Sequence, residues 1–294
     1  MKQGFGLQQL NKEKENRDMK KIFLALALLV SMACQAQKQL EILHTNDTHS
    51  CIMPLNVNLA DTSVAGRGGF VRRVAMIKQE RERNPQLLLI DSGDFSQGSP
   101  YYSLFKGEVE IGLMNCMKYD AVTIGNHEFD FGLENMARLF RMAKFPIVCS
   151  NYDFTGTPVE GLVKKYVVLH RNGLKIGLFG LCPELQGLVD MNKCEGVRYL
   201  DPVEVGNEMA RLLKEQEKCD VVVCISHLGW LKPDEMGDPY FLARSRNVDV
   251  LLGGHSHSYF KELRYVKDLD GKQVPVDQNG KNAIYVGKLT LTFK

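Results

Sequence analysis

The chain has 294 residues, of which 44% are hydrophobic and 24% are charged. These proportions are typical of a globular protein and exclude a disordered chain. The formal net charge is +2, and residues 37–294 carry 31 basic and 32 acidic side chains without a long basic run. Stable binding to nucleic acid through neutralisation of its phosphates is therefore not expected.

The first 36 residues are expected to form a leader. A basic pair and an apolar run over residues 20–30 are followed by small residues, as in a signal peptide. The run is too short to cross a bilayer as a helix. We expect Met19 to be the true start, with an upstream extension before it, and cleavage after Ala36. In an alternative, Cys34 is lipidated and anchors the protein to a membrane. Both alternatives predict an exported protein, in the periplasm or on the outer surface.

Seven cysteines follow Cys34, and none are spaced as in CxxC, so a structural zinc cluster is not indicated. Because seven is odd, at least one thiol is expected to be unpaired within the chain. Cys149, Cys219 and Cys224 lie in or beside apolar runs, and we interpret them as buried core residues. Export would permit disulfides without requiring them.

Short apolar runs bounded by polar residues or glycine predict buried strands. In chain order they cover residues 40–43, 87–90, 121–124, 147–150, 166–169, 174–180, 221–225 and 248–252, with closing strands around 283–286 and 289–293. Amphipathic patterns between them predict helices over 68–83, 108–117, 133–143 and 202–216, the last with Asp201 as its N-cap. The alternation of strands and helices indicates an α/β fold, which we assign to one domain over residues 37–294.

Five short polar segments follow the ends of predicted strands and contain five of the seven histidines. They are Asp47-Thr48-His49, Gly93-Asp94, Gly125-Asn126-His127-Glu128, His227 and Gly253-Gly254-His255-Ser256-His257. Side chains at successive strand ends can meet at one rim of a sheet. This mixture of oxygen and nitrogen donors suits divalent metals such as Zn, Mn, Fe or Co. Asp47 and His49 are expected to share one side of an extended segment, as are His255 and His257.

These residues predict a site for two divalent cations about 3.5–4 Å apart, which is an arrangement that serves phosphoryl transfer. Asp94 is expected to bridge the cations. A hydroxide held between them would attack phosphorus in line, while the cations neutralise the phosphate oxygens. His127, oriented by Asp130, would then stabilise or protonate the leaving oxygen.

The order of these motifs resembles the calcineurin-like metallophosphoesterase superfamily. The longer strings HTNDTHS, GRGGFVRR, DSGDFSQGSP, GNHEFDFG and GGHSHS are similar to those of the catalytic domain in its 5′-nucleotidase and UDP-sugar hydrolase branch. The resemblance covers nearly the whole chain after the leader. It implies a four-layer αββα sandwich with a dimetal site at the sheet rim.

The resemblance also implies a role for each site residue. The first cation would be held by Asp47, His49, Asp94 and His257, and the second by Asp94, Asn126, His227 and His255. His127 and Asp130 match the catalytic pair of the branch. Position 257 varies among its members. His44 and His170 lie outside the pattern and are interpreted as structural, and Glu128 as a supporting carboxylate. Arg72 and Arg73 would either contact phosphate or lie on a solvated helix face.

Members of this branch usually carry a second, carboxy-terminal domain that binds the nucleoside, and we expect that domain to be absent from this chain. The leading hypothesis is an exported dimetal phosphoesterase that hydrolyses phosphate monoesters, above all 5′-nucleotides. One alternative is cleavage of UDP-sugars at their pyrophosphate bond. Others are a catalytic subunit that needs a separate carboxy-terminal-domain protein, and a metal-bound scaffold without activity.

Overall fold

The computed structural model describes residues 17, 19–20 and 38–293. The chain divides into two compact units, Met1–Gln39 with Thr292–Lys294, and Leu40–Leu291. The buried core and all nine predicted site residues belong to Leu40–Leu291.

The predicted leader stays a prediction, because residues 1–36 lie outside the described residues apart from Arg17, Met19 and Lys20. The alternative lipidation site at Cys34 is likewise not described. Within the part of the chain that the structure describes, no helix has both the length and the apolar character needed to cross a membrane.

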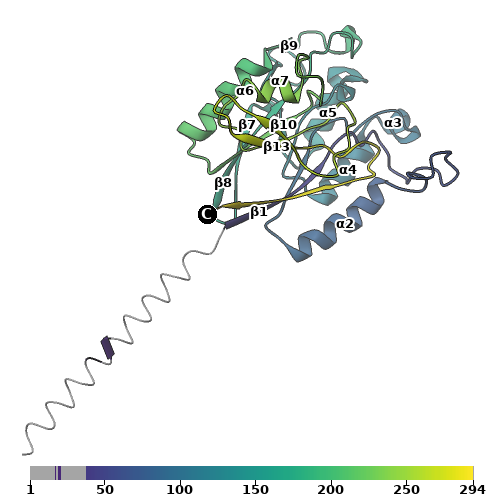
Figure 1. The fold of residues 1–294 in the computed structure, drawn as a ribbon. Coiled ribbons are helices and arrows are strands. Elements are labelled where there is room, and N and C mark those ends of the chain that lie inside the picture. Colours follow the sequence, from purple (N-terminus) through teal and green to yellow (C-terminus); the bar gives the residue numbers. More distant parts are fainter. Residues whose placement is uncertain (1–16, 18, 21–37, 294) are drawn as a thin grey trace, which may run out of the picture. The chain divides into compact units, whose positions relative to one another are not determined.

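The strands form two six-stranded sheets and one two-stranded sheet (Figure 1). In the first large sheet the order is β14 (Gly287–Phe293), β1 (Lys38–Thr45), β2 (Leu88–Asp91), β3 (Ala121–Val122), β4 (Ile147–Val148) and β6 (Val163–Lys164). In the second it is β12 (Arg264–Lys267), β13 (Gln273–Asp277), β11 (Val250–Leu252), β10 (Val221–Ser226), β8 (Leu174–Leu181) and β7 (Tyr166–Arg171). The small sheet pairs β5 (Tyr152–Asp153) with β9 (Arg198–Tyr199).

Six α-helices connect these strands in the described residues. They are α2 (Phe70–Arg83), α3 (Pro100–Phe105), α4 (Glu108–Met117), α5 (Gly132–Met142), α6 (Pro202–Arg211) and α7 (Asp238–Leu242). Short 3₁₀ turns cover η1 (His127–Phe129) and η2 (Met191–Lys193), and a π-helical turn, η3 (Leu212–Gln216), extends α6. The four predicted helices are confirmed, whereas α3 and α7 were not predicted.

One predicted strand is wrong. Residues 283–286 were expected to be extended, but the closing strand starts only at Gly287. Asn282 and Ala283 adopt left-handed backbone conformations, with φ of 60° and 56°. These conformations turn the chain just before β14 and are incompatible with strand pairing.

The alternation of side chains along the strands accounts for the layers. Leu87 and Leu89 of the β2 segment pack in one apolar cluster with side chains of α2, α4 and α5. Val222 and Cys224 of β10 pack in another with α6 and α7. Leu88 and Val223 point to the opposite faces and are also fully buried, since successive side chains alternate across a strand. The two sheets therefore pack on each other between two helical layers, as the predicted αββα sandwich requires.

Asp201 caps α6 as the sequence predicts. Its Oδ1 accepts hydrogen bonds from the backbone N–H groups of Val203 (2.7 Å) and Glu204 (3.0 Å). Replacing Asp201 with alanine should lower the free energy of unfolding by about 1 kcal/mol, and Tm by about 2–4 °C for a domain of this size. Thermal unfolding followed by circular dichroism measures the change. Asp201→Asn keeps the acceptor and is the control; an equal loss in both variants would contradict the capping role.

The parallel pairing of the strands determines where the site residues lie. β1, β2 and β3 run parallel to one another in the first sheet, and β10 and β11 run parallel in the second. Their carboxyl ends therefore lie at the same rim of each sheet. The five polar segments with the predicted site residues are the loops that leave these ends.

Candidate metal centre

The structure brings six of the seven predicted metal residues, together with His127, into three groups of donor atoms. Within each group the atoms lie no more than 4.8 Å from one another. The groups are Asp47, His49 and His257; Asp94, His227 and His255; and His49, Asp94 and His127. The first two groups share no residue, and the third joins them. Side chains from five segments, spread over more than two hundred residues, thus converge on two adjacent positions.

Asp47 and His49, like His255 and His257, were expected to share one side of an extended segment, and this expectation is wrong. Asp47 and His49 do not lie in an extended segment, because both have φ of 47°, and Asp94 has φ of 53°. His255 and His257 are also left-handed, with φ of 69° and 56°, and they join different groups instead of sharing a side. Non-glycine residues in this region are strained by about 1–3 kcal/mol each, and such strain concentrates at functional sites.

Hydrogen bonds between neighbouring loops hold this strained backbone in place. The N–H of Asp47 donates to Gly93 O and the N–H of His49 donates to Asp94 O, both at 3.0 Å. The N–H of His255 in turn lies 3.1 and 3.0 Å from the two carboxylate oxygens of Asp47. The three loops therefore position one another, and a shift in one changes the donor atoms of the others.

The environment of His227 requires a positive charge beside its ring. Nδ1 lies 2.6 Å from the carbonyl oxygen of Ser92, which can only accept, so Nδ1 carries a proton. Nε2 lies 3.1 Å from Oδ2 of Asp94 but makes no hydrogen bond. In a neutral ring, the lone pair of Nε2 would face a carboxylate in a fully buried position. A second ring proton or a bound cation relieves this repulsion.

Other donor atoms are buried without partners in the same region. Asn126 Oδ1 and His49 Nδ1 are inaccessible to solvent and accept or donate no hydrogen bond among the described residues. The Nε2 atoms of His49 and His257 lie 2.9 Å apart. Buried polar atoms are rarely left unpaired in native proteins. The donor set, of carboxylate and amide oxygens with imidazole nitrogens, therefore fits divalent transition metals.

The electrostatics of the site favour cations. Burial raises the pKa of Asp47 to about 7 and lowers the pKa of His49 to about 3 and that of His255 to about 4. Burial acts in the same way on Asp94 and His227, but their mutual attraction outweighs it. The pKa of Asp94 falls below its usual range, and that of His227 rises to about 10. Neutral His49 and His255 are in the protonation state that metals require.

His127 and Asp130 form a hydrogen-bonded pair at the accessible side of the site. Nδ1 of His127 lies 3.2 Å from both carboxylate oxygens of Asp130, and the backbone N–H of His127 donates to Asp94 Oδ1 at 2.9 Å. Burial lowers the pKa of His127, but the Asp130 hydrogen bond and the Asp94 charge outweigh it and raise the pKa overall. The His127 side chain is 24% exposed, whereas Asp94 and His227 are buried.

Glu128 joins the loops instead of facing a metal position. Its carboxylate accepts hydrogen bonds from the backbone N–H groups of Gly125 (2.6 Å), Asp94 (3.0 Å) and Ser96 (3.2 Å). These contacts agree with its interpretation as a supporting residue. Burial and the nearby Asp94 charge raise the pKa of Glu128 to about 8.

Arg73 supports the site in a way that the sequence did not predict. It lies neither on a solvated helix face nor at a phosphate position, since it is only 4% exposed. One guanidinium nitrogen donates to Thr48 Oγ1 at 2.7 Å and the other to Tyr285 O at 3.3 Å. Tyr102 is a second such residue, because its hydroxyl donates to the carbonyl of His127 at 3.2 Å. The only hint in the sequence was that Arg73 belongs to GRGGFVRR.

Gly125 is required by close packing against Asp94. A Cβ at this position would overlap Asp94 Oδ1 and lie 2.5 Å from Asp94 N. Gly125→Ala should therefore displace the Asp94 loop, lower the free energy of unfolding by about 1–3 kcal/mol, and reduce bound metal as measured by plasma mass spectrometry. Gly112→Ala, at an exposed position of α4 with no atom within 4 Å, is the control. Full metal content in Gly125→Ala would show that the loop tolerates the methyl group.

Known proteins are similar to this chain over most of its length. Residues 40–259 match the model of the calcineurin-like phosphoesterase family. Human 5′-nucleotidase is 31% identical over 291 residues, which cover 92% of this chain and 49% of that protein. The apyrase of Tabanus yao is 31% identical over 273 residues, which cover 86% of this chain and 48% of that protein.

A solved structure shows the same fold. The crystal structure of the 5′-nucleotidase precursor from Thermus thermophilus has a TM-score of 0.77 at 31% identity, and the match covers 87% of this chain and 52% of that chain. This chain thus spans about half the length of the relatives that it matches. The family match extends over most of the chain and includes every predicted metal residue. The chain therefore belongs to the calcineurin-like phosphoesterase family.

Proposed function

We propose that this protein hydrolyses phosphate monoesters and that 5′-nucleotides are its main substrates. The observation that carries the proposal is the pair of separate donor groups joined through His49 and Asp94, because two adjacent cations suit phosphoryl transfer. The similarity to 5′-nucleotidases of human and Thermus origin supports the nucleotide as substrate. An apyrase among the relatives makes nucleoside di- and triphosphates further substrates to test.

We assign the ligands as follows. Asp47, His49, Asp94 and His257 would hold one cation, and Asp94, Asn126, His227 and His255 would hold the other. Asp94 belongs to both sets, which agrees with its position within 4.8 Å of donor atoms from both sides of the site. The unpaired Oδ1 of Asn126 and Nε2 of His227 support their assignment to the second cation.

The protein groups around these positions perform the remaining chemistry. When bound, two divalent cations would withdraw charge from the phosphate oxygens and lower the pKa of the attacking water. The hydrogen bond from the backbone N–H of His127 to Asp94 Oδ1 holds the His127 backbone beside Asp94, and the contact with Asp130 orients the ring. Asp130 accepts a hydrogen bond from His127 Nδ1–H and stabilises the protonated ring, so that Nε2–H can donate its proton to the oxygen of the departing nucleoside.

Exposure defines the side from which a substrate would approach. The side chains of His127, Asp130 and His257 are 24%, 33% and 37% exposed, whereas Asp47 and His227 are fully buried. A phosphate would therefore enter over His127, with its ester oxygen next to that ring. The predicted leader places this activity outside the cytoplasm, either as a soluble periplasmic enzyme or as a lipoprotein.

A substrate panel tests the proposal. The chain would be stripped with EDTA, reloaded separately with Mn²⁺, Zn²⁺ or Co²⁺, and assayed for phosphate release from AMP, ATP and p-nitrophenyl phosphate. We expect AMP hydrolysis that needs added metal. UDP-glucose, assayed for UMP and glucose 1-phosphate, distinguishes the pyrophosphatase alternative. A metal-loaded, folded protein that cleaves none of these compounds would contradict the proposal and leave two alternatives, the scaffold and the catalytic subunit that needs a separate carboxy-terminal-domain protein.

A further inference from the structure

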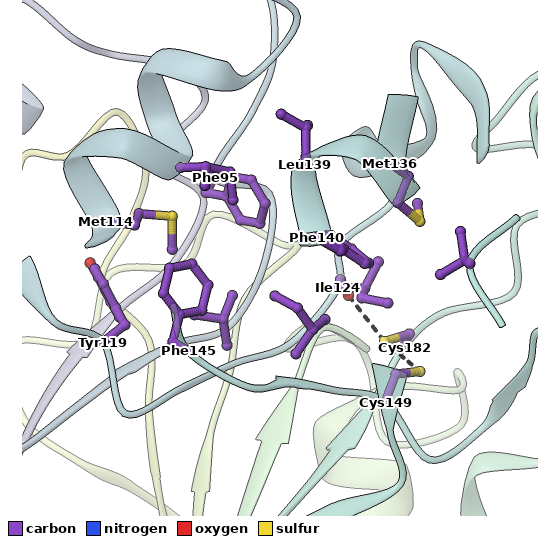
Figure 2. Close-up of a cluster of buried hydrophobic side chains, with 14 of the residues drawn as sticks. Phe95, Met114, Tyr119, Ile124, Met136, Leu139, Phe140, Phe145, Cys149 and Cys182 are labelled. Atoms are coloured by element: carbon purple, nitrogen blue, oxygen red, sulfur yellow. Dashed lines mark hydrogen bonds between the residues drawn. The ribbon is translucent and has the colours of Figure 1, made fainter. Parts of the chain in front are cut away.

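Two cysteines that are 33 residues apart in the sequence meet in the core beneath the site. Cys149 directly follows β4 of the first sheet, and Cys182 directly follows β8 of the second. Their Sγ atoms lie 3.3 Å apart, and neither residue is more than 1% exposed (Figure 2). The two thiols therefore come from different sheets of the sandwich and lie in contact with each other.

The backbone around the two thiols is held together by contacts that do not involve sulfur. The side-chain amide of Asn151 accepts from the N–H of Cys182 and donates to its carbonyl oxygen, both at 2.8 Å. The N–H of Ser150 donates to Gly180 O at 2.8 Å. These contacts fix the segments after β4 and β8 side by side, so the closeness of the thiols follows from the packing of the two sheets.

We propose that Cys149 and Cys182 form a disulfide that crosslinks the two sheets beneath the metal centre. An S–S bond requires about 2.05 Å, so the sulfurs need to approach by only about 1.3 Å from their present distance. Such a shift is within reach of small rotations of the two side chains. The proposal does not depend on the substrate, and an oxidising compartment outside the cytoplasm would favour it.

Thiol–disulfide exchange with a low-molecular-weight disulfide, such as oxidised glutathione, supplies the oxidation. The thiolate of one cysteine attacks the glutathione disulfide, forms a mixed disulfide and releases one glutathione thiolate. The second cysteine thiolate then attacks the mixed disulfide, forms the Cys149–Cys182 bond and releases the second. Two cysteine sulfurs are oxidised, one glutathione disulfide is reduced to two thiols, and the two cysteine protons pass to them.

Burial determines when this exchange takes place. It raises the pKa of Cys182 well above its usual range, so the folded protein contains little of the reactive thiolate. We therefore expect the bond to form while the chain folds. Once formed, it would also remove the S–H donor that now points to the carbonyl oxygen of Ile124 at 3.0 Å, two residues before Asn126 (Figure 2).

Cysteine mapping tests the bond directly. The reduced full-length chain would be refolded with oxidised and reduced glutathione, quenched with acid, and labelled with N-ethylmaleimide in guanidinium without reductant. We expect the peptides of Cys149 and Cys182 to remain unlabelled and to appear in the mass spectrum as one crosslinked species. Cys224, equally buried on β10, should be labelled. Maleimide on both Cys149 and Cys182 in the folded fraction would overturn the proposal.

Thermal unfolding provides the second measurement. Reduction with dithiothreitol should lower the Tm of the wild type and of the control Cys224→Ala by roughly 5–10 °C, since the closed loop restricts the unfolded chain. Cys149→Ala and Cys182→Ala should show no such difference between oxidised and reduced samples. A decrease that either variant retains, or a wild type whose Tm is insensitive to reduction, would contradict the crosslink. If a variant fails to fold, the mapping of the wild type decides alone.

Discussion

Replacing Asp94 with asparagine should lower kcat/KM for AMP by at least about 10³-fold, which corresponds to about 4 kcal/mol of transition-state stabilisation. The carboxylate is buried, lies 3.1 Å from His227 Nε2, and belongs to the donor group of His227 and His255 and to the third group, which joins it to His49. An amide keeps the shape but removes the negative charge that would hold two cations together. We therefore expect the metal content, measured by plasma mass spectrometry, to fall along with the activity.

The control for this variant is Asp270→Asn. Asp270 is an exposed carboxylate paired with Arg246, in the loop before β13 and so at the opposite end of β13 from the site. The Asp270→Asn variant should retain the activity and the metal content of the wild type. The Tm of Asp94→Asn should stay within a few degrees of the wild type, so that lost activity is not lost folding. An Asp94→Asn protein with wild-type turnover and two bound metals would refute the shared-ligand assignment.

Replacing His127 with glutamine should reduce kcat on AMP by about 10²–10⁴-fold, the usual contribution of a general acid. The ribose alkoxide that leaves from AMP is a strong base and needs a proton, whereas p-nitrophenolate is stable without one. The loss on p-nitrophenyl phosphate should therefore be much smaller. Steady-state kinetics on both substrates, with metal content measured in parallel, separates these effects.

Asp130→Asn provides the matched comparison. The amide can still contact His127 Nδ1 but no longer stabilises a positive imidazole. We therefore expect kcat on AMP to fall by about 10–100-fold, and kcat on p-nitrophenyl phosphate to fall by less. Equal losses on AMP and p-nitrophenyl phosphate in His127→Gln would show that the ring does not act on the leaving oxygen. A decrease in bound metal would instead indicate that His127 is a ligand, as its membership in the third donor group permits.

Local sequence patterns were sufficient for most of the fold. The apolar runs that became β1, β2, β8, β10 and β11 are buried on both faces, and such runs can be recognised without knowledge of their neighbours. The patterns failed where backbone conformation overrides composition. The run 283–286 is apolar, but left-handed Asn282 and Ala283 turn it out of the sheet. The short helix α3 was missed because six residues carry too little periodicity.

The sequence by itself predicted which residues would meet at the site, because each polar segment follows a strand end and parallel strands end at one rim. Only the tertiary structure decided how those residues meet. The left-handed backbone at Asp47, the unpaired Nε2 of His227 and the buried guanidinium of Arg73 all depend on loops from distant parts of the chain. The same holds for the contact between Cys149 and Cys182. Periodicity reports the local environment of a residue, whereas such contacts arise only when the two sheets pack.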